Sequence, residues 1–263
     1  VYQFRHSGRS GRVGSAFEGC GLWHARSPRE ALAPCPCGEF FPRRRRRRTA
    51  PRIRARKLRT IASLDLRMPP LPPITQALLL VNVAAFCIDI FLGPWFTRAF
   101  ALWPFGSGFL PWQVLSYAFL HGSFGHLFFN MLGIWMFGAE LERAWGPRRF
   151  THYYFASVLA AAATQLLVNA LLGSQNPTVG ASGGLFGLLL AFGMMFPNRT
   201  VMLLIPPIPM KAKVLVFAYG AIELVLGVMD PQGGVAHFAH LGGMLGGFLM
   251  LRYWRGQPPF GRR

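Results

Sequence analysis

The segment GASGGLFGLLLAFGMMF occupies residues 180–196 and joins a small-residue turn to an apolar run. The run from Leu185 to Phe196 has the composition of a membrane helix, and Ser182 stands between small residues just before it. Polar groups within membrane spans are costly, so they mark candidate functional sites. The segment therefore predicts a helical membrane protein with a reactive side chain at the mouth of one short helix.

Five further apolar runs accompany this segment, and a spanning helix needs about 20 mostly apolar residues. The candidate spans are 74–93, 122–142, 150–172, 182–197, 213–229 and 235–253. Six such runs leave no polar face for water, which argues against a large soluble helical core. We predict an all-α fold: a polytopic bundle of six transmembrane helices in residues 68–255, followed by a cytoplasmic tail in 256–263.

Charge separates the N-terminal part of the chain from the rest. Residues 1–67 hold 17 of the 28 Lys and Arg residues but only 4 of the 9 Asp and Glu residues. They include the run Arg43–Arg48 and no sustained apolar period, so we predict a disordered Arg-rich tail rather than a patch for nucleic acid or acidic lipid. Met68 directly precedes the first apolar span, and we hypothesise that it is the native start.

Positive charge is also uneven between the loops. Ten Lys and Arg residues lie on the side that includes the C-terminal tail, and only Arg98 lies on the other side. The positive-inside rule then predicts that both termini are cytoplasmic. The outer connection from Gly93 to His121 carries nine Trp, Phe and Tyr residues, so we expect it to lie partly in the outer membrane interface.

Polar side chains from three spans are predicted at a similar depth in the outer half of the membrane. His126 and Asn130 are four residues apart on one helix face, and His240 lies near the start of the sixth span. A helix from Ser182 to Phe196 is about 22 Å long against a hydrocarbon core of about 30 Å, so Ser182 is expected below the outer surface. The free N–H groups at this helix N-terminus suit a developing oxyanion.

Glycine-rich faces on the fourth and sixth spans allow two backbones to approach closely. The glycines are Gly183 and Gly187 in the fourth span and Gly242, Gly243, Gly246 and Gly247 in the sixth. Such an approach is what Ser182 and His240 need to reach hydrogen-bond distance, about 2.6–3.2 Å. Plain helix packing also explains the glycines, but it does not explain Ser182 and His240 beside them.

Each polar residue also has a structural explanation. Ser182 could merely cap a helix, and His240 could be a packed core histidine. His237 is a rival base, but it lies closer to the outer loop, and His121 is expected to order the aromatic connection. No carboxylate or thiolate stands at ligand spacing from the histidines, and the cysteines have neither zinc nor redox spacing. We therefore predict no metal and no cofactor.

These motifs together resemble the rhomboid family of intramembrane serine proteases, of bacterial type, over residues 74–253. Gly180-Ala181-Ser182-Gly183 resembles the family's Gly-x-Ser-Gly element, which implies that Ser182 is the nucleophile. Ala239-His240-Leu241-Gly242-Gly243 resembles its Ala-His-x-x-Gly element, which implies that His240 is the general base.

The resemblance extends to supporting positions. His121, His126 and Asn130-Met131 resemble the histidine-rich second helix, which implies that His126 and Asn130 stabilise the oxyanion together with the backbone around Ser182. Phe186 stands where the family has an aromatic ring against the histidine. Leu141-Glu142 and Gly146 resemble the element that closes the second helix. Where the family often has Trp-Arg in the outer loop, this chain has Trp112-Gln113, a departure that concerns loop anchoring.

The resemblance implies peptide-bond hydrolysis through an acyl-enzyme, in membrane proteins whose helices are unstable near the outer leaflet. No third acid is evident near His240, so the sequence predicts a Ser–His dyad. The expected partners are transmembrane substrates and the lipid bilayer, without nucleic acid or metal, and the expected location is the bacterial inner membrane. The alternatives are a non-catalytic rhomboid-like protein that binds or escorts membrane helices, and a small-solute channel.

Overall fold

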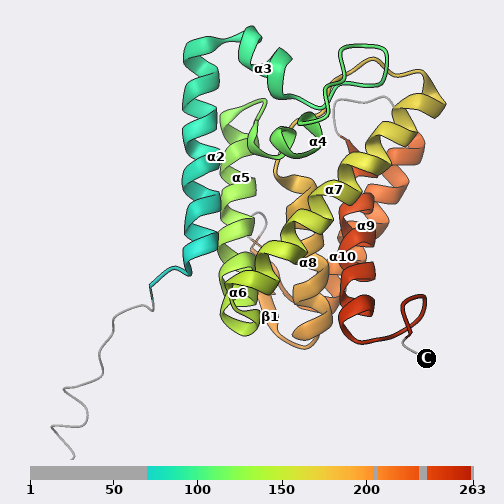
Figure 1. Ribbon diagram of the computed structural model, residues 1–263. Coiled ribbons are helices and arrows are strands. Elements are labelled where there is room, and N and C mark those ends of the chain that lie inside the picture. Colours follow the sequence, from blue (N-terminus) through green and yellow to red (C-terminus); the bar gives the residue numbers. More distant parts are fainter. Residues whose placement is uncertain (1–69, 204–206, 231–235, 262–263) are drawn as a thin grey trace, which may run out of the picture. The chain divides into compact units, whose positions relative to one another are not determined.

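The computed structural model describes residues 70–203, 207–230 and 236–261, all within one helical unit (Figure 1). The Arg-rich tail and Met68 lie outside the described residues. The helices are α2 (Pro73–Leu92), α3 (Pro94–Phe100), α4 (Gln113–Ser116), η1 (Tyr117–Phe119), α5 (Phe124–Gly133), η2 (Ile134–Gly138), α6 (Ala139–Trp145), α7 (Pro147–Leu172), α8 (Ser182–Met195), α9 (Ala212–Met229) and α10 (His237–Trp254). The strands β1 (Thr200–Met202) and β2 (Pro209–Lys211) pair in antiparallel fashion.

The predicted all-α fold is confirmed, and each predicted span corresponds to a helix. The second span consists of α5, a π-helical segment η2 and α6 in direct succession. Within the described ranges, α2, α7 and α9 are each long and apolar enough to cross a membrane, whereas α8 is a shorter apolar helix. Large apolar side chains on α2 and α9, such as Phe91 and Phe217, are exposed, as is typical of surfaces that face lipid rather than water.

Glycines bring α10 against two neighbouring helices. A Cβ atom on Gly243 would overlap the carbonyl oxygen of Gly183 in α8, so the two backbones touch at this point. Gly242 and Gly246 instead face Thr164 and Ala160 of α7. The glycines of the sixth span therefore form two faces, one for each neighbour, and α10 packs closely against both α7 and α8.

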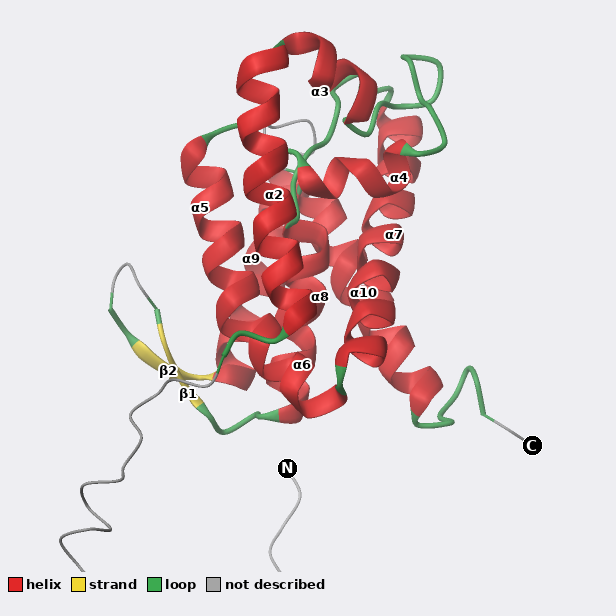
Figure 2. Cartoon of the chain, turned by 60° about the vertical axis from the view of Figure 1, so that its left-hand side comes forward, coloured by secondary structure: helices red, strands yellow, loops and turns green. Residues whose placement is uncertain are grey.

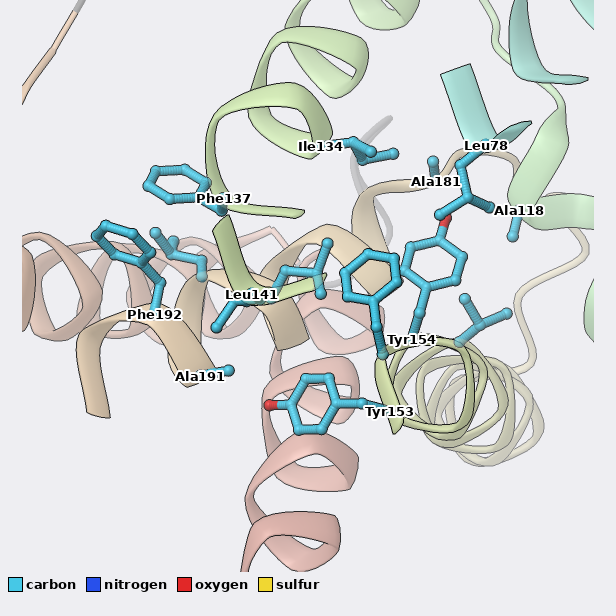
Figure 3. Packing of buried hydrophobic residues seen from close by; sticks show 14 of the residues in the cluster. Leu78, Ala118, Ile134, Phe137, Leu141, Tyr153, Tyr154, Ala181, Ala191 and Phe192 are labelled. Atoms are coloured by element: carbon cyan, nitrogen blue, oxygen red, sulfur yellow. The ribbon is translucent and has the colours of Figure 1, made fainter. Parts of the chain in front are cut away.

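Large aromatic side chains fill the space between the helices (Figure 3). Tyr153 is fully buried, and its hydroxyl donates a hydrogen bond of 2.8 Å to the carbonyl of Gly187. Phe137 and Phe192 meet edge to face with ring centroids 5.0 Å apart. The Tyr153 bond satisfies a polar group that would otherwise be costly between apolar helices, so it ties α7 to α8.

The outer connection and the β-hairpin lie at opposite ends of the bundle (Figure 2). Gln113, from the Trp112-Gln113 departure, is fully buried within the outer connection. Its side-chain oxygen accepts bonds from the N–H groups of Trp103 and Leu110, and its nitrogen donates to the carbonyls of Ala99 and Gly108. Gln113 thus anchors this connection with a neutral side chain.

Glu142 of α6 caps the N-terminus of α2, at the end of the bundle opposite the outer connection. One carboxylate oxygen accepts a 2.9 Å bond from the N–H of Ile74, and the other accepts bonds from the N–H and hydroxyl of Thr75, at 2.7 and 2.8 Å. These N–H groups belong to the first turn of α2 and have no partner within their own helix. An anion there also interacts favourably with the helix dipole. These bonds to the first turn of α2 explain why the Glu142 carboxylate is buried at the end of the second span.

Replacing Glu142 by alanine is expected to destabilise the fold by roughly 3 kcal/mol, because buried hydrogen bonds to a charged group are lost and their donors stay unpaired. Thermal unfolding in detergent would measure the loss as a lower midpoint. Glu140→Ala is the matched control on the same helix. Glu140 pairs with the exposed Arg199, so its loss should cost less than about 1 kcal/mol. Equal midpoints for the two variants would contradict the capping role.

Candidate active site

Ser182 and His240 meet between α8 and α10. Ser182 is the first residue of α8, and His240 lies in the first turn of α10. The Oγ atom of Ser182 and the Nε2 atom of His240 are 2.8 Å apart, and the histidine is buried. At this distance the hydroxyl can donate its proton to the imidazole, which is the geometry of a nucleophile beside its general base.

Small residues make this meeting possible. Gly180 has a φ of +130°, and a Cβ atom there would lie 2.8 Å from the His126 ring. A side chain at this position would therefore be strained and would also push His126 away. On the other side, the contact between Gly183 and Gly243 lies within one turn of Ser182 and His240. Glycine at these positions thus brings the polar groups of three helices close together.

Phe186 packs against the imidazole of His240. Its ring stacks on His240 with centroids 4.3 Å apart and an interplanar angle of 5°. Phe186 is four residues after Ser182 on the same helix, so α8 supplies both the hydroxyl and the stacking ring.

His126 and Asn130 line the same cavity as Ser182 and His240, with a volume of about 1210 Å³. The Asn130 side-chain nitrogen donates a 2.8 Å bond to the carbonyl of His126, which leaves its second N–H for a ligand. The helical bonding of α8 begins with the N–H of Leu185, so the earlier N–H groups of this helix remain available. Side-chain and backbone donors thus border the space in front of the hydroxyl.

His121 packs against His126. It is buried, and its ring meets that of His126 edge to face at 5.0 Å. Burial, followed by the nearby His126, lowers the pKa of His121 to about 4. The ring is therefore neutral at physiological pH and can pack against its neighbour without adding charge.

The outer connection braces the turn before Ser182, which the sequence did not indicate. Leu102 and Thr178 form a β-bridge through two backbone bonds, at 3.0 and 2.9 Å. The N–H of Gly180 donates a 2.9 Å bond to the carbonyl of Tyr117. These are backbone contacts between segments far apart in the chain, so no side-chain pattern could have predicted them. They hold the Gly-x-Ser-Gly turn against the aromatic connection.

The expectation that no acid lies near His240 is wrong. Glu223 of α9 is buried, and its Oε2 atom lies 2.6 Å from Nδ1 of His237 and 2.8 Å from Nδ1 of His240. Glu223 lies on α9 and the two histidines lie on α10, so ligand-type spacing in the sequence could not reveal the cluster. A signal was present, however, because Glu223 is the single acidic residue of the predicted span 213–229.

Glu223, His237 and His240 carry the side-chain types that bind metals, and their ligand atoms lie within 4.8 Å of one another. Ligands of a tetrahedral zinc ion would stand roughly 3.3 Å apart, given bonds of about 2.0–2.2 Å. The carboxylate lies closer than that to each imidazole, at hydrogen-bond distance. The observed arrangement therefore favours a direct hydrogen bond to His237 and a close contact with His240 over ligation of a shared ion, and the absence of a metal stays a prediction.

The fold and the site together define a class: an all-helical protein with membrane-capable helices and a hydrogen-bonded serine–histidine pair beside a cavity. The family model described as Rhomboid domain matches residues 109–256. The chain belongs to the rhomboid family, a family of intramembrane proteases, and it is an integral membrane protein.

Three relatives illustrate the similarity. The chain is 33% identical over 179 residues to Rhomboid protein 1, mitochondrial, of Saccharomyces cerevisiae, covering 67% of this chain and 51% of the relative. It is 35% identical over 139 residues to RHOMBOID-like protein 4 of Arabidopsis thaliana, covering 53% and 33%. It is 26% identical over 186 residues to Rhomboid protease GlpG of Yersinia pestis, covering 69% and 62%. The chain thus spans between a third and two thirds of these proteins.

Proposed function

We propose that this chain is an intramembrane serine endopeptidase that cleaves transmembrane segments of membrane proteins near the outer leaflet. The observation that carries the proposal is the 2.8 Å contact between Ser182 Oγ and His240 Nε2 within a rhomboid-family fold. A relative named as a rhomboid protease adds support. The substrates would be helices that unwind enough to present a peptide bond to the cavity in front of Ser182.

The proposed reaction has two halves. His240 takes the Ser182 proton while the oxygen attacks the scissile carbonyl, and the leaving amine then takes that proton from His240. Side-chain donors of His126 and Asn130, with backbone N–H groups near Gly183, would stabilise the oxyanion. Water then hydrolyses the acyl-enzyme by the same proton transfers. The cavity of about 1210 Å³ offers room for an extended segment of substrate and for this water.

We further propose that residues 68–255 form one protease domain with six spans and that both termini are cytoplasmic. The support is the loop charge asymmetry and the correspondence of helices to the six apolar runs. The bacterial inner membrane predicted from the sequence gains no support from the relatives, because the yeast relative is named as mitochondrial. The proposed location is therefore an integral membrane one.

Labelling by a fluorophosphonate probe tests the reaction directly, because only an activated serine forms the adduct. The full chain in detergent is expected to be labelled, and Ser182→Ala is expected to lose the label entirely. Mass spectrometry of the modified peptide should identify Ser182 as the site. Labelling of Ser182→Ala at the wild-type level would discard the assignment.

The same experiment separates the rival functions. A rhomboid-like protein that only binds or escorts membrane helices would need no activated hydroxyl and would not be labelled in either form. A channel would also lack labelling, and it would need polar side chains along whole helices. The polar residues of the proposed active site instead lie at the N-terminal turns of α8 and α10 and on α5.

A further inference from the structure

Three contacts surround the imidazole of His240, and two of them already have an explanation. The Nε2 atom faces Ser182 at 2.8 Å, and the ring face stacks on Phe186. The third contact, between Nδ1 and the carboxylate of Glu223, also measures 2.8 Å, but the oxygen approaches away from the hydrogen-bond direction.

The chemistry of imidazole decides what this contact can do. A neutral histidine carries one proton, on either Nδ1 or Nε2, and only the Nδ1–H form leaves Nε2 free to accept the proton of Ser182. Within the described residues, His240 Nδ1 has no regular hydrogen bond, although it is buried. Glu223 is the acceptor at hand, because a carboxylate can accept several bonds. An acceptor at Nδ1 therefore selects the tautomer that makes His240 a base.

We propose that Glu223 is a positioning residue that accepts a hydrogen bond from Nδ1–H of His240 and so completes a Ser182–His240–Glu223 triad. This inference rests on the proposed function. During acylation the Ser182 proton moves to Nε2, the Nδ1 proton stays on the imidazole, and the carboxylate stabilises the imidazolium that results. The proposal replaces the dyad predicted from the sequence.

His237 shares the carboxylate and determines its position. Its Nδ1 atom forms a 2.6 Å hydrogen bond with the same Glu223 oxygen. One turn of α10 thus presents two imidazoles to one residue of α9. The titratable groups that face His240 are Glu223 from α9, His126 from α5 and His237 from its own helix.

The decisive variant is Glu223→Gln, which keeps the size and removes the charge. In the full chain, its fluorophosphonate labelling rate is expected to fall by at least about tenfold, with an upper limit of about 10⁴-fold for an amide in place of a triad acid. Glu223→Asp should regain part of the rate, and Glu140→Gln is the control with a surface carboxylate.

A second measurement reports the hydrogen bond without catalysis. In ¹⁵N-histidine spectra of the protein in detergent, with His240→Ala used for assignment, His240 is expected as the Nδ1–H tautomer. This tautomer should be lost or mixed in Glu223→Gln. If the glutamine variant does not fold, the wild-type spectrum decides alone, since an Nε2–H tautomer would overturn the proposal.

The outcomes separate this inference from the proposed function. An unchanged labelling rate and an unchanged His240 tautomer in Glu223→Gln, with labelling abolished in Ser182→Ala, would overturn the positioning role and leave the protease proposal intact. No labelling of the wild type, with a tautomer that still changes in Glu223→Gln, would discard the protease proposal and uphold the hydrogen bond.

Discussion

Cleavage of a single-span model substrate in reconstituted membranes is expected to fall by about 10⁴–10⁶-fold in His240→Ala, the range for the loss of the base in serine proteases. The reason is geometric, because His240 Nε2 is the ring nitrogen at hydrogen-bond distance from the Ser182 hydroxyl. Without it, the hydroxyl keeps its proton and remains a weak nucleophile. The loss should lie in kcat, since no substrate contact is removed.

His237→Ala is the informative comparison, because His237 is the rival base on the same helix. Its Nδ1 atom is bonded to Glu223 rather than to Ser182, so we expect a loss of about 10–100-fold, of the size of a supporting contact. The exposed His152 of α7 provides the neutral control, and His152→Ala should cleave at the wild-type rate. A larger loss in His237→Ala than in His240→Ala would assign the role of general base to His237 and the supporting role to His240.

The sequence predicted the helices well because its signals were local. Long apolar runs, with few charges inside them, correspond to the helices within a few residues at most ends. Pro73 and Pro147 stand at helix starts, while Gly146 and Gly173 stand where a positive φ ends α6 and α7. The π-helical segment η2 was not predicted, because nothing in its apolar composition distinguishes it from the α-helix around it.

Part of the candidate site could be predicted from the sequence. The predicted part depends on short motifs within one segment, and the missed part depends on contacts between segments far apart in the chain. The contacts among Ser182, His240 and Phe186 could be predicted because their motifs are short and the periodicity of α8 fixes the ring relative to the hydroxyl, while their roles in catalysis stay proposals. Glu223 was missed because its significance depends on how α9 faces α10, which no local pattern encodes. The Leu102–Thr178 bridge was missed for a similar reason, since it joins two irregular segments through backbone atoms.

The helix contact that unites Ser182 and His240 is expected to tolerate no added methyl group. In Gly243→Ala, the new Cβ would overlap the carbonyl oxygen of Gly183 and lie 2.8 Å from its carbonyl carbon. These are backbone atoms and cannot rotate away, so α8 and α10 must separate. Misplacing reacting groups by about 1 Å can cost about 10²-fold in rate, and overpacking typically costs about 1–3 kcal/mol of stability. We therefore expect at least about 100-fold slower labelling of Ser182 and a lower unfolding midpoint.

Gly220→Ala is the matched control, because a Cβ on this glycine of α9 would meet only the flexible Met244 side chain, at 3.5 Å or more. Labelling there should match the wild type, and the higher helix propensity of alanine should leave the midpoint equal or raise it. Labelling is measured well below both midpoints, so that slow reaction in Gly243→Ala reports geometry rather than unfolding. Wild-type labelling in Gly243→Ala would mean that the approach of Gly183 to Gly243 does not hold Ser182 and His240 together.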